Sequence, residues 1–355
     1  MRRAIRLAAR AEGRTRPNPM VGCVIVGASG KVLAEGYHHR AGQAHAEMDA
    51  LGKVQSAAGA TVYVTLEPCN HQGRTGPCAE ALVAASVKRV VVGMRDPNPR
   101  VPGGGVERLR RAGIAVEVGV LEAECRWLGR MWIHFMTTGL PWVTLKAAVT
   151  LDGRMAARGG DSRWVTGEAA RKEAHRLRAT HDAILVGAGT VRADDPELTV
   201  RSVRGIDPVR VVVDGKLGVG ARARVLPALI FAANDAPVRR FPGETEVVRL
   251  AGRGRVSLAA VLKELGKRGV QSVLVEGGGE IHGQLLAAGL VDEVALFVAP
   301  KLIGSGGVPL LGSLLGPSKM AEAWTLSSPV TKRLGDDVYI RGALTKASAR
   351  AKPRR

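Results

Sequence analysis

The segment Glu67-Pro-Cys-Asn-His-Gln-Gly-Arg-Thr-Gly-Pro-Cys78, together with His45-Ala-Glu47 upstream, decides how the N-terminal half of this chain is interpreted. The two segments supply one histidine and two cysteines, the ligand number and type of a catalytic zinc site that keeps its fourth position open. Glu47 follows two residues after the histidine, where a carboxylate transfers protons beside the metal without binding it. We therefore predict a zinc centre with three ligands and one general acid/base: His45, Cys69, Cys78 and Glu47.

Taken singly, each of these residues has an ordinary structural explanation, because lone histidines and cysteines are more often packed or capped side chains than ligands. Their combination in this order favours zinc. Zinc deaminases usually separate the two cysteines by two residues, so the longer insert 70–77 must loop out. His71 within this insert is either a substitute ligand or a substrate contact, and we favour the contact. Cys23 and Cys125 are expected to be packing residues.

The composition favours two layered α/β domains. A chain of 355 residues exceeds what one hydrophobic core usually organises. Hydrophobic residues make up 46% of the chain but aromatic residues only 3%, so aliphatic side chains must fill the cores, as in helices packed on a buried sheet. We expect a domain at 1–141, a second at 142–345 and a basic, disordered tail at 346–355.

Short apolar runs alternate with amphipathic segments along both halves of the chain. Strands are predicted at 21–26, 61–66, 89–94 and 114–118, and then at 143–150, 183–186, 209–213 and 272–275. Helices are predicted near the N-terminus, at 45–58, from about 77, at 106–112 and 121–138, and then at 167–179, 258–268 and 280–288. The alternation is typical of layered α/β domains.

The net charge of +20 invites a nucleic-acid interpretation, but the excess is spread along both halves, and such a surface also attracts small phosphorylated substrates. With few aromatic side chains to stack on bases, no nucleic-acid partner is expected. No apolar run approaches the roughly 18 residues of a membrane span, so no membrane association is expected. Four cysteines are too few for a disulfide scaffold. We expect a cytoplasmic protein, although the arginine-rich start also imitates a transit peptide.

Several segments outside the zinc motif indicate which family of zinc deaminases this chain is most similar to. The sequence resembles the bifunctional riboflavin-biosynthesis deaminase/reductase family to about residue 345. The long insert between the cysteines belongs to that family. Gly76-Pro77 and the segment 102–105 depart from it, since consecutive prolines and a basic residue are more usual there. Besides the zinc motif, the resemblance rests on Thr15-Arg-Pro-Asn-Pro-Met-Val-Gly-Cys-Val-Ile-Val26, Asp96-Pro-Asn-Pro99, Leu145-Lys-Ala-Ala-Val-Thr-Leu-Asp-Gly-Arg154, the segment 186–201 and Val275-Glu-Gly-Gly-Gly279.

The resemblance implies a cytidine-deaminase-like three-layer α/β/α domain followed by a dihydrofolate-reductase-like α/β domain. The first would hydrolyse the 2-amino group of 2,5-diamino-6-ribosylamino-4(3H)-pyrimidinone 5′-phosphate, and the second would reduce the ribosyl chain of the product to ribityl with NADPH. Asn18 would contact the base, although between two prolines it is also an ordinary turn residue, and Asn98 with its loop would hold substrate. The family also implies a homo-oligomer.

The second site has a weaker local signal. Glu276-Gly-Gly-Gly279 is expected at a strand end that opens a helix, where backbone N–H groups suit a pyrophosphate. The full G-x-G-x-x-G spacing is missing, so a Rossmann domain is not supported. The resemblance implies substrate positions at Ser162, Arg178, Leu198, Arg201 and Glu276. It implies cofactor positions at Ala148, Trp164, Thr190, Asp194, Gly278, Gly279, Glu280, Ile281, His282, Gly283 and Gln284.

Several of these positions keep a second interpretation. Arg178 and Arg201 suit bidentate binding of a ribose 5′-phosphate, but a solvated helix face and a strand-edge charge explain them too. Asp194 also fits a helix cap and turn, and Lys146 and Asp152 are weaker candidates for proton transfer or orientation. Two other functions stay open: a nucleic-acid base deaminase, and a nucleotide-binding protein that performs no reduction.

Overall fold

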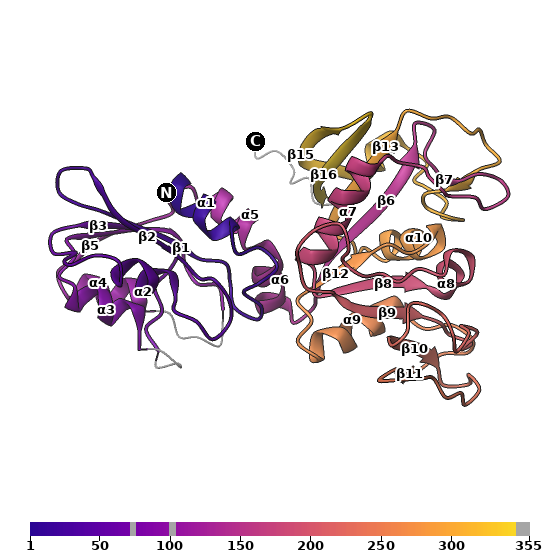
Figure 1. The fold of residues 1–355 in the computed structure, drawn as a ribbon, viewed down its shortest axis with the longest axis horizontal. Coiled ribbons are helices and arrows are strands. Elements are labelled where there is room, and N and C mark those ends of the chain that lie inside the picture. The colour runs from indigo at the N-terminus through magenta and orange to yellow at the C-terminus, as the bar shows by residue number, and fades with distance from the viewer. Residues whose placement is uncertain (72–75, 99–103, 346–355) are drawn as a thin grey trace. The chain divides into compact units, whose positions relative to one another are not determined.

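The computed structural model describes residues 1–71, 76–98 and 104–345. The chain forms two compact units, Met1–Gly139 and a second that begins at Leu140 (Figure 1). The proposed tail at 346–355 and part of the segment 102–105 lie outside the described residues.

The first unit is a five-stranded sheet in the order β2-β1-β3-β4-β5, covered by helices on both faces. The strand β1 pairs antiparallel with β2 and β3, and β3, β4 and β5 are parallel. Figure 1 shows α1 and α5 on one face and α2, α3 and α4 on the other, which confirms the three-layer prediction. The elements are α1 (Arg2–Ala9), β1 (Gly22–Val26), β2 (Val32–Tyr37), α2 (Ala46–Leu51), β3 (Thr61–Leu66), α3 (Cys78–Ala84), β4 (Arg89–Met94), α4 (Gly105–Arg111), β5 (Ala115–Val118), α5 (Glu122–Leu128) and α6 (Arg130–Thr138).

The second unit contains a nine-stranded sheet in the order β11-β10-β9-β8-β12-β6-β13-β16-β15. It is parallel from β11 to β13 and ends in the antiparallel strands β16 and β15. This mixed α/β sheet agrees with the expected fold class. The strands are β6 (Trp142–Thr150), β8 (Ala183–Gly187), β9 (Val209–Val213), β10 (Leu229–Ala233), β11 (Glu246–Leu250), β12 (Ser272–Val275), β13 (Glu293–Ala299), β15 (Thr325–Leu334) and β16 (Asp337–Thr345). The helices are α7 (Glu168–Thr180), α8 (Ala188–Asp194), α9 (Leu258–Lys267), α10 (Gly279–Ala287) and the short 3-10 turn η1 (Met320–Glu322), and β7 (Arg154–Ala156) pairs with β14 (Val308–Pro309).

Most predicted elements are present within one or two residues, and the exceptions have local causes. The helix predicted at 45–58 ends at Leu51, because Gly52 caps it. The helix predicted at 121–138 is two helices, since Gly129 leaves helical geometry between α5 and α6. The segment 187–196 contains the unpredicted helix α8, and β10, β11, β13, β15 and β16 were also missed.

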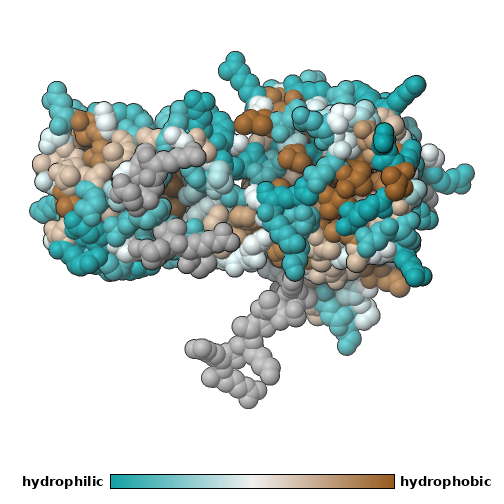
Figure 2. All heavy atoms as spheres, turned by 90° about the horizontal axis from the view of Figure 1, so that it is seen from below, coloured by the Kyte–Doolittle hydropathy of each residue, from teal (hydrophilic) through white to brown (hydrophobic). Residues whose placement is uncertain are grey.

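The surface is consistent with the dispersed charge of the sequence. On the face shown in Figure 2, hydrophilic residues cover much of both units and are not gathered on one of them. None of the helices in the described part of the chain combines the length and the apolar character that crossing a bilayer requires.

Candidate active sites

Close packing of α2 on the sheet places the histidine and glutamate of the zinc motif. His45 is the extended N-cap residue of α2, and Glu47 lies in its first turn. The helix approaches β2 at Gly36, where a Cβ atom would lie 2.3 Å from the Ala46 carbonyl oxygen and 2.5 Å from the Ala50 nitrogen. Only glycine therefore allows this approach.

The two cysteines meet His45 from separate elements. Cys69 follows the end of β3, and Cys78 is the first residue of α3. His45 Nδ1 lies 3.5 Å from Cys69 Sγ and 3.3 Å from Cys78 Sγ, and the three ligand atoms all lie within 4.8 Å of one another. Tetrahedral zinc with Zn–N near 2.0 Å and Zn–S near 2.3 Å separates nitrogen from sulfur by roughly 3.5 Å. The residues present fit a zinc ion.

The electrostatics around this cluster suit metal binding and proton transfer. Hydrogen bonds from Cys78 and His45 lower the pKa of Cys69 to about 4, which favours the thiolate that metals bind. Glu47 is 3% exposed, and burial raises its pKa to about 7. A carboxyl group with a pKa near neutrality both accepts and returns a proton efficiently.

A cavity of about 330 Å³ opens beside this cluster. His38 lines it and was not predicted from the sequence, because it lies outside the His45-Ala-Glu47 motif. Its Nε2 lies 3.1 Å from Asn18 Nδ2, and its Nδ1 lies 3.0 Å from the Ala44 carbonyl oxygen. With Nδ1 donating to that carbonyl, Nε2 accepts from Asn18 and fixes the orientation of the amide. The cavity is lined by Pro17, Asn18, Pro19, Val21, His38, His45, Glu47, Leu66, Glu67, Cys69, His71, Asp96, Asn98, Trp132 and Met136.

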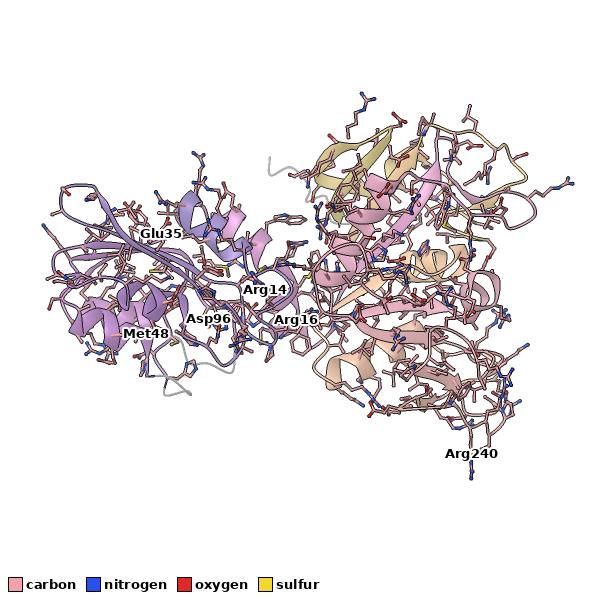
Figure 3. All side chains as sticks on the ribbon, in the orientation of Figure 1. Arg14, Arg16, Glu35, Met48, Asp96 and Arg240 are labelled. Carbon is pink, nitrogen blue, oxygen red and sulfur yellow. The ribbon has the colours of Figure 1, made fainter. Side chains whose placement is uncertain are left out.

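Glu67 organises the far wall of this cavity and was also missed. Its carboxylate is 7% exposed and accepts hydrogen bonds from the backbone nitrogens of Asp96 at 3.2 Å and Val106 at 3.1 Å. Asp96, labelled in Figure 3, in turn accepts from the Asn98 backbone nitrogen at 2.8 Å. Gly105 packs against the Pro68 carbonyl oxygen, which a Cβ atom there would approach to 1.8 Å. Glu67 thus ties the loop after β4 and the start of α4 to the zinc cluster.

In the second unit, a cavity of about 880 Å³ lies at the carboxyl ends of the parallel strands. The ends of β8 and β12 lead into α8 and α10, so backbone N–H groups and the positive end of α10 face the cavity. The carboxyl edge of a parallel sheet is the usual ligand site of α/β proteins. Of the predicted residues, Ser162, Thr190, Asp194, Glu276, Gly278, Gly279, Glu280, Ile281 and Gln284 line this cavity.

A second cavity of about 460 Å³ shares some of these residues and contains a buried ion cluster. Arg178 donates to Glu276 from Nε at 2.8 Å and from Nη2 at 2.9 Å, and Lys146 Nζ lies 3.3 Å from the same carboxylate. Burial alone would raise the pKa of Glu276, but the charges of Arg178 and Lys146 outweigh it and hold the pKa well below its usual range. The predicted residues that line this cavity are Ala148, Ser162, Trp164, Arg178, Thr190, Asp194, Leu198, Arg201, Glu276 and His282.

Comparison with known proteins assigns both halves. Residues 1–94 match the cytidine and deoxycytidylate deaminase zinc-binding region, and residues 141–336 match the RibD C-terminal domain. The riboflavin biosynthesis protein RibD of Bacillus amyloliquefaciens is 44% identical, with 96% of this chain and 94% of that protein covered. The Escherichia coli K12 protein of the same name is 41% identical, with 96% and 97% covered. The chain belongs to the RibD family.

Solved structures agree with this membership. A Thermotoga maritima diaminohydroxyphosphoribosylaminopyrimidine deaminase/5-amino-6-(5-phosphoribosylamino)uracil reductase superposes with a TM-score of 0.88 at 36% identity, covering 98% of this chain and 97% of that one. Acinetobacter baumannii RibD superposes with a TM-score of 0.86 at 39% identity, covering 97% and 98%. As a RibD protein, the chain has a deaminase and a reductase domain for riboflavin biosynthesis, as the sequence predicted.

Within this RibD framework, the structure adds the contacts of two predicted residues. Arg178, predicted as a substrate position, lines the 460 Å³ cavity and donates to Glu276 and, from Nη1, to the Thr199 carbonyl oxygen at 3.0 Å. Gly283 lines neither cavity of the second unit; a Cβ atom there would lie 2.4 Å from the Leu311 carbonyl oxygen. Gly283 therefore packs closely against the segment at Leu311.

Proposed function

We propose that residues 1–141 deaminate 2,5-diamino-6-ribosylamino-4(3H)-pyrimidinone 5′-phosphate and that residues 142–345 reduce the ribosyl chain of the product with NADPH. The observation that carries the first step is the convergence of one imidazole and two thiols, with all three ligand atoms within 4.8 Å, beside a buried carboxyl group. The four free cysteines suit a reducing compartment such as the cytoplasm.

For deamination, His45, Cys69 and Cys78 would hold zinc. A zinc ion held by these three ligands would lower the pKa of water from 15.7 to about 7 and so would supply a nucleophile at neutral pH. Glu47 would accept a proton from the attacking water and deliver it to the departing amine, which would leave as ammonia while the ring carbon gains oxygen. Asn18, whose amide orientation is fixed by His38, would bind the edge of the pyrimidine.

For reduction, NADPH supplies a hydride, and the protein supplies position and charge. The Gly277–Gly279 segment at the start of α10 would bind the cofactor diphosphate. The cavity beside Lys146 and Glu276 would hold the ribosyl chain, with Lys146 as the ammonium group nearest that carboxylate. Arg201, half-exposed on the wall of that cavity, remains suited to the 5′-phosphate because its guanidinium carries a permanent charge.

The direct test is to incubate the purified chain with the diaminopyrimidine phosphate and to measure ammonia release, zinc content and loss of NADPH absorbance. We expect about one zinc per chain, ammonia release without NADPH, and NADPH oxidation only after deamination. Ammonia release from cytidine in RNA or DNA and not from the free phosphate would support a nucleic-acid deaminase instead. NADPH binding without substrate-dependent oxidation would leave a deaminase joined to a nucleotide-binding domain. Light scattering would test the homo-oligomer that the family suggests.

A further inference from the structure

His175 lines the 460 Å³ cavity together with Arg178 and Glu276, and the functions above give it no role. The residue lies on α7 and is 9% exposed. Its Nδ1 lies 3.2 Å from the backbone nitrogen of Arg201, in a segment outside helices and strands. A backbone N–H group can only donate, so the imidazole nitrogen is the acceptor. His175 therefore holds the backbone of the residue that is suited to the 5′-phosphate.

A second side chain of α7 holds the same segment. Arg178 lies three residues after His175, on the same face of the helix, and its Nη1 donates to the Thr199 carbonyl oxygen at 3.0 Å. Between the two held residues, the backbone nitrogen of Val200 donates to Asp207 at 2.6 Å. One side chain of the helix thus binds an N–H group and the other a carbonyl oxygen. Together they fix the position of the segment along α7.

The side chain of Arg201 is held at its other end. Its guanidinium pairs with Glu197 and donates from Nη1 to Thr199 Oγ1 at 3.1 Å. The side chain is nevertheless 53% exposed, so it remains accessible to a ligand. An arginine loses rotamer freedom when it binds an anion, and contacts that hold it beforehand reduce this cost. The contact with His175 fixes the backbone from which this side chain extends.

The contact requires the neutral form of the imidazole. Nδ1 accepts a hydrogen bond only when it carries no proton, so the ring proton lies on Nε2. Burial lowers the pKa of His175. The charges of Arg178 and Arg201 lower this pKa further and outweigh the opposite effect of Glu276. The surroundings of His175 therefore keep Nδ1 available as an acceptor at neutral pH.

We propose that His175 is a positioning residue of the reductase, which holds the backbone of Arg201 so that the guanidinium binds the 5′-phosphate of the substrate. This inference rests on the proposed function, because it concerns the substrate of the same site. The role requires a hydrogen-bond acceptor at the position of Nδ1. It requires no proton transfer by the ring, which distinguishes it from a catalytic role.

Steady-state kinetics of NADPH oxidation by the full chain test this role, with the deaminated ribosylaminouracil phosphate as the varied substrate. His175→Leu removes the acceptor and leaves the Arg201 N–H group unpaired. We expect KM to rise about tenfold and kcat to stay within about twofold, because the lost contact supports binding and not the chemical step. His175→Asn should keep KM within about threefold, because its Oδ1 replaces Nδ1 as acceptor.

A second background tests whether His175 acts through Arg201. Arg201→Ala should itself raise KM, because it removes the proposed phosphate ligand. His175→Leu added to Arg201→Ala should then change KM by less than about twofold, since no guanidinium remains to be positioned. The same increase in both backgrounds would show that His175 acts independently of Arg201 and would overturn the inference.

Further variants separate positioning from a general loss of structure. Lys172→Leu alters an exposed residue of the same helix that does not line the cavity, and it should leave KM unchanged. The Kd of NADPH, measured by isothermal titration calorimetry, should stay within about twofold in every variant. If Lys172→Leu or His175→Asn raises KM as much as His175→Leu does, the acceptor is not responsible and the inference is overturned.

His175→Gln replaces the leucine variant if that chain no longer binds NADPH. Glutamine stays polar but places its amide one bond farther from the helix, so its acceptor does not coincide with Nδ1. We expect a higher KM for His175→Gln than for His175→Asn. Equal KM values in the glutamine, asparagine and unchanged chains would overturn the inference.

The outcomes also separate this inference from the proposed reduction. Absence of substrate-dependent NADPH oxidation by the unchanged chain would overturn the proposed reduction and the role of His175 with it. Oxidation by the unchanged chain, combined with an unaltered KM in His175→Leu, would overturn only the role of His175 and leave the reductase intact.

Discussion

Arg178 on α7 and Glu276 after β12 are 98 residues apart in the chain and form a two-point ion pair, with Nε and Nη2 at 2.8 and 2.9 Å from the carboxylate. Both side chains are largely buried, at 13% and 9% exposure. Lys146 approaches the same carboxylate from β6. The three residues therefore join the helix to two adjacent strands in the lining of the 460 Å³ cavity.

Removing the arginine should destabilise the second unit. Arg178→Met leaves Glu276 buried with only Lys146 as partner, and we expect a loss of about 3 to 5 kcal/mol in the free energy of unfolding, measured by urea denaturation. Arg176→Met is the matched control on the same helix, because Arg176 is 56% exposed in its pair with Glu173. It should cost at most about 1 kcal/mol. Equal effects of the two substitutions would contradict a structural role for the buried pair.

The zinc cluster makes a separate prediction about metal content and turnover. Cys78→Ser should lose zinc, because it removes one of three protein ligands. Glu47→Gln should keep zinc and lose about 10² to 10⁴ in deamination rate, since the amide is similar in shape but carries no transferable proton. Elemental analysis and ammonia release measure the two effects.

A third cysteine controls for the loss of a buried thiol. Cys125 is 3% exposed and packs in the core away from the ligand set, so Cys125→Ser should keep both zinc and activity. Normal deamination by Glu47→Gln would remove that residue from the proposed role, and retention of stoichiometric zinc by Cys78→Ser would remove Cys78 from the ligand set.

The sequence predicted the zinc site because all its ligands belong to short motifs. His45 and Glu47 are two residues apart, and the insert between Cys69 and Cys78 is characteristic of one family. Glu67 carried no such signal, since its partners are backbone nitrogens 29 and 39 residues away. The same holds for the ion pair of Arg178 with Glu276, because the two residues are 98 positions apart in the sequence.

The missed strands illustrate two limits of pattern analysis. The apolar run of β10 is fully buried, and buried strands lack the alternation that marks half-buried ones. In contrast, β15 is exposed at eight of its ten positions. Its sequence therefore also lacks the alternation of apolar and polar residues that predicts a strand. Both strands are defined by their pairing with neighbours, which local sequence does not encode.

Because α2 packs so closely on Gly36, we expect that adding one methyl group at this position disturbs the zinc site. Gly36→Ala would place its Cβ atom against the backbone of α2, forcing a shift of the helix that carries His45 and Glu47. We expect a loss of about 1 to 3 kcal/mol in stability and weaker zinc retention during dialysis against a chelator. Gly52→Ala at the other end of α2 meets only ordinary contact, at 3.4 Å from the Met48 carbonyl oxygen, and should keep zinc. Equal zinc loss in both variants would mean that the close approach does not position the ligands.

The burial of His282 should make the free energy of unfolding of the second unit depend on pH. His282 is 1% exposed, and its Nδ1 lies 3.3 Å from the Leu310 carbonyl oxygen. Burial lowers its pKa to about 4, against about 6.5 in an unfolded chain. Between these values the unfolded state binds the proton and the folded state does not. The stabilisation is therefore complete above pH 6.5 and is lost as the pH falls toward 4.

His282→Asn keeps a donor near the Nδ1 position but removes the titrating ring. Urea unfolding at pH 7.5 and pH 4.5 should show a loss of stability in the unchanged chain that exceeds the loss in the variant by on the order of 2 kcal/mol. His71→Asn, at an exposed histidine, should retain the pH dependence of the unchanged chain. The substitution His282→Asn removes one titrating group, the buried imidazole. If the variant kept the pH dependence of the unchanged chain, a group other than His282 would cause that dependence.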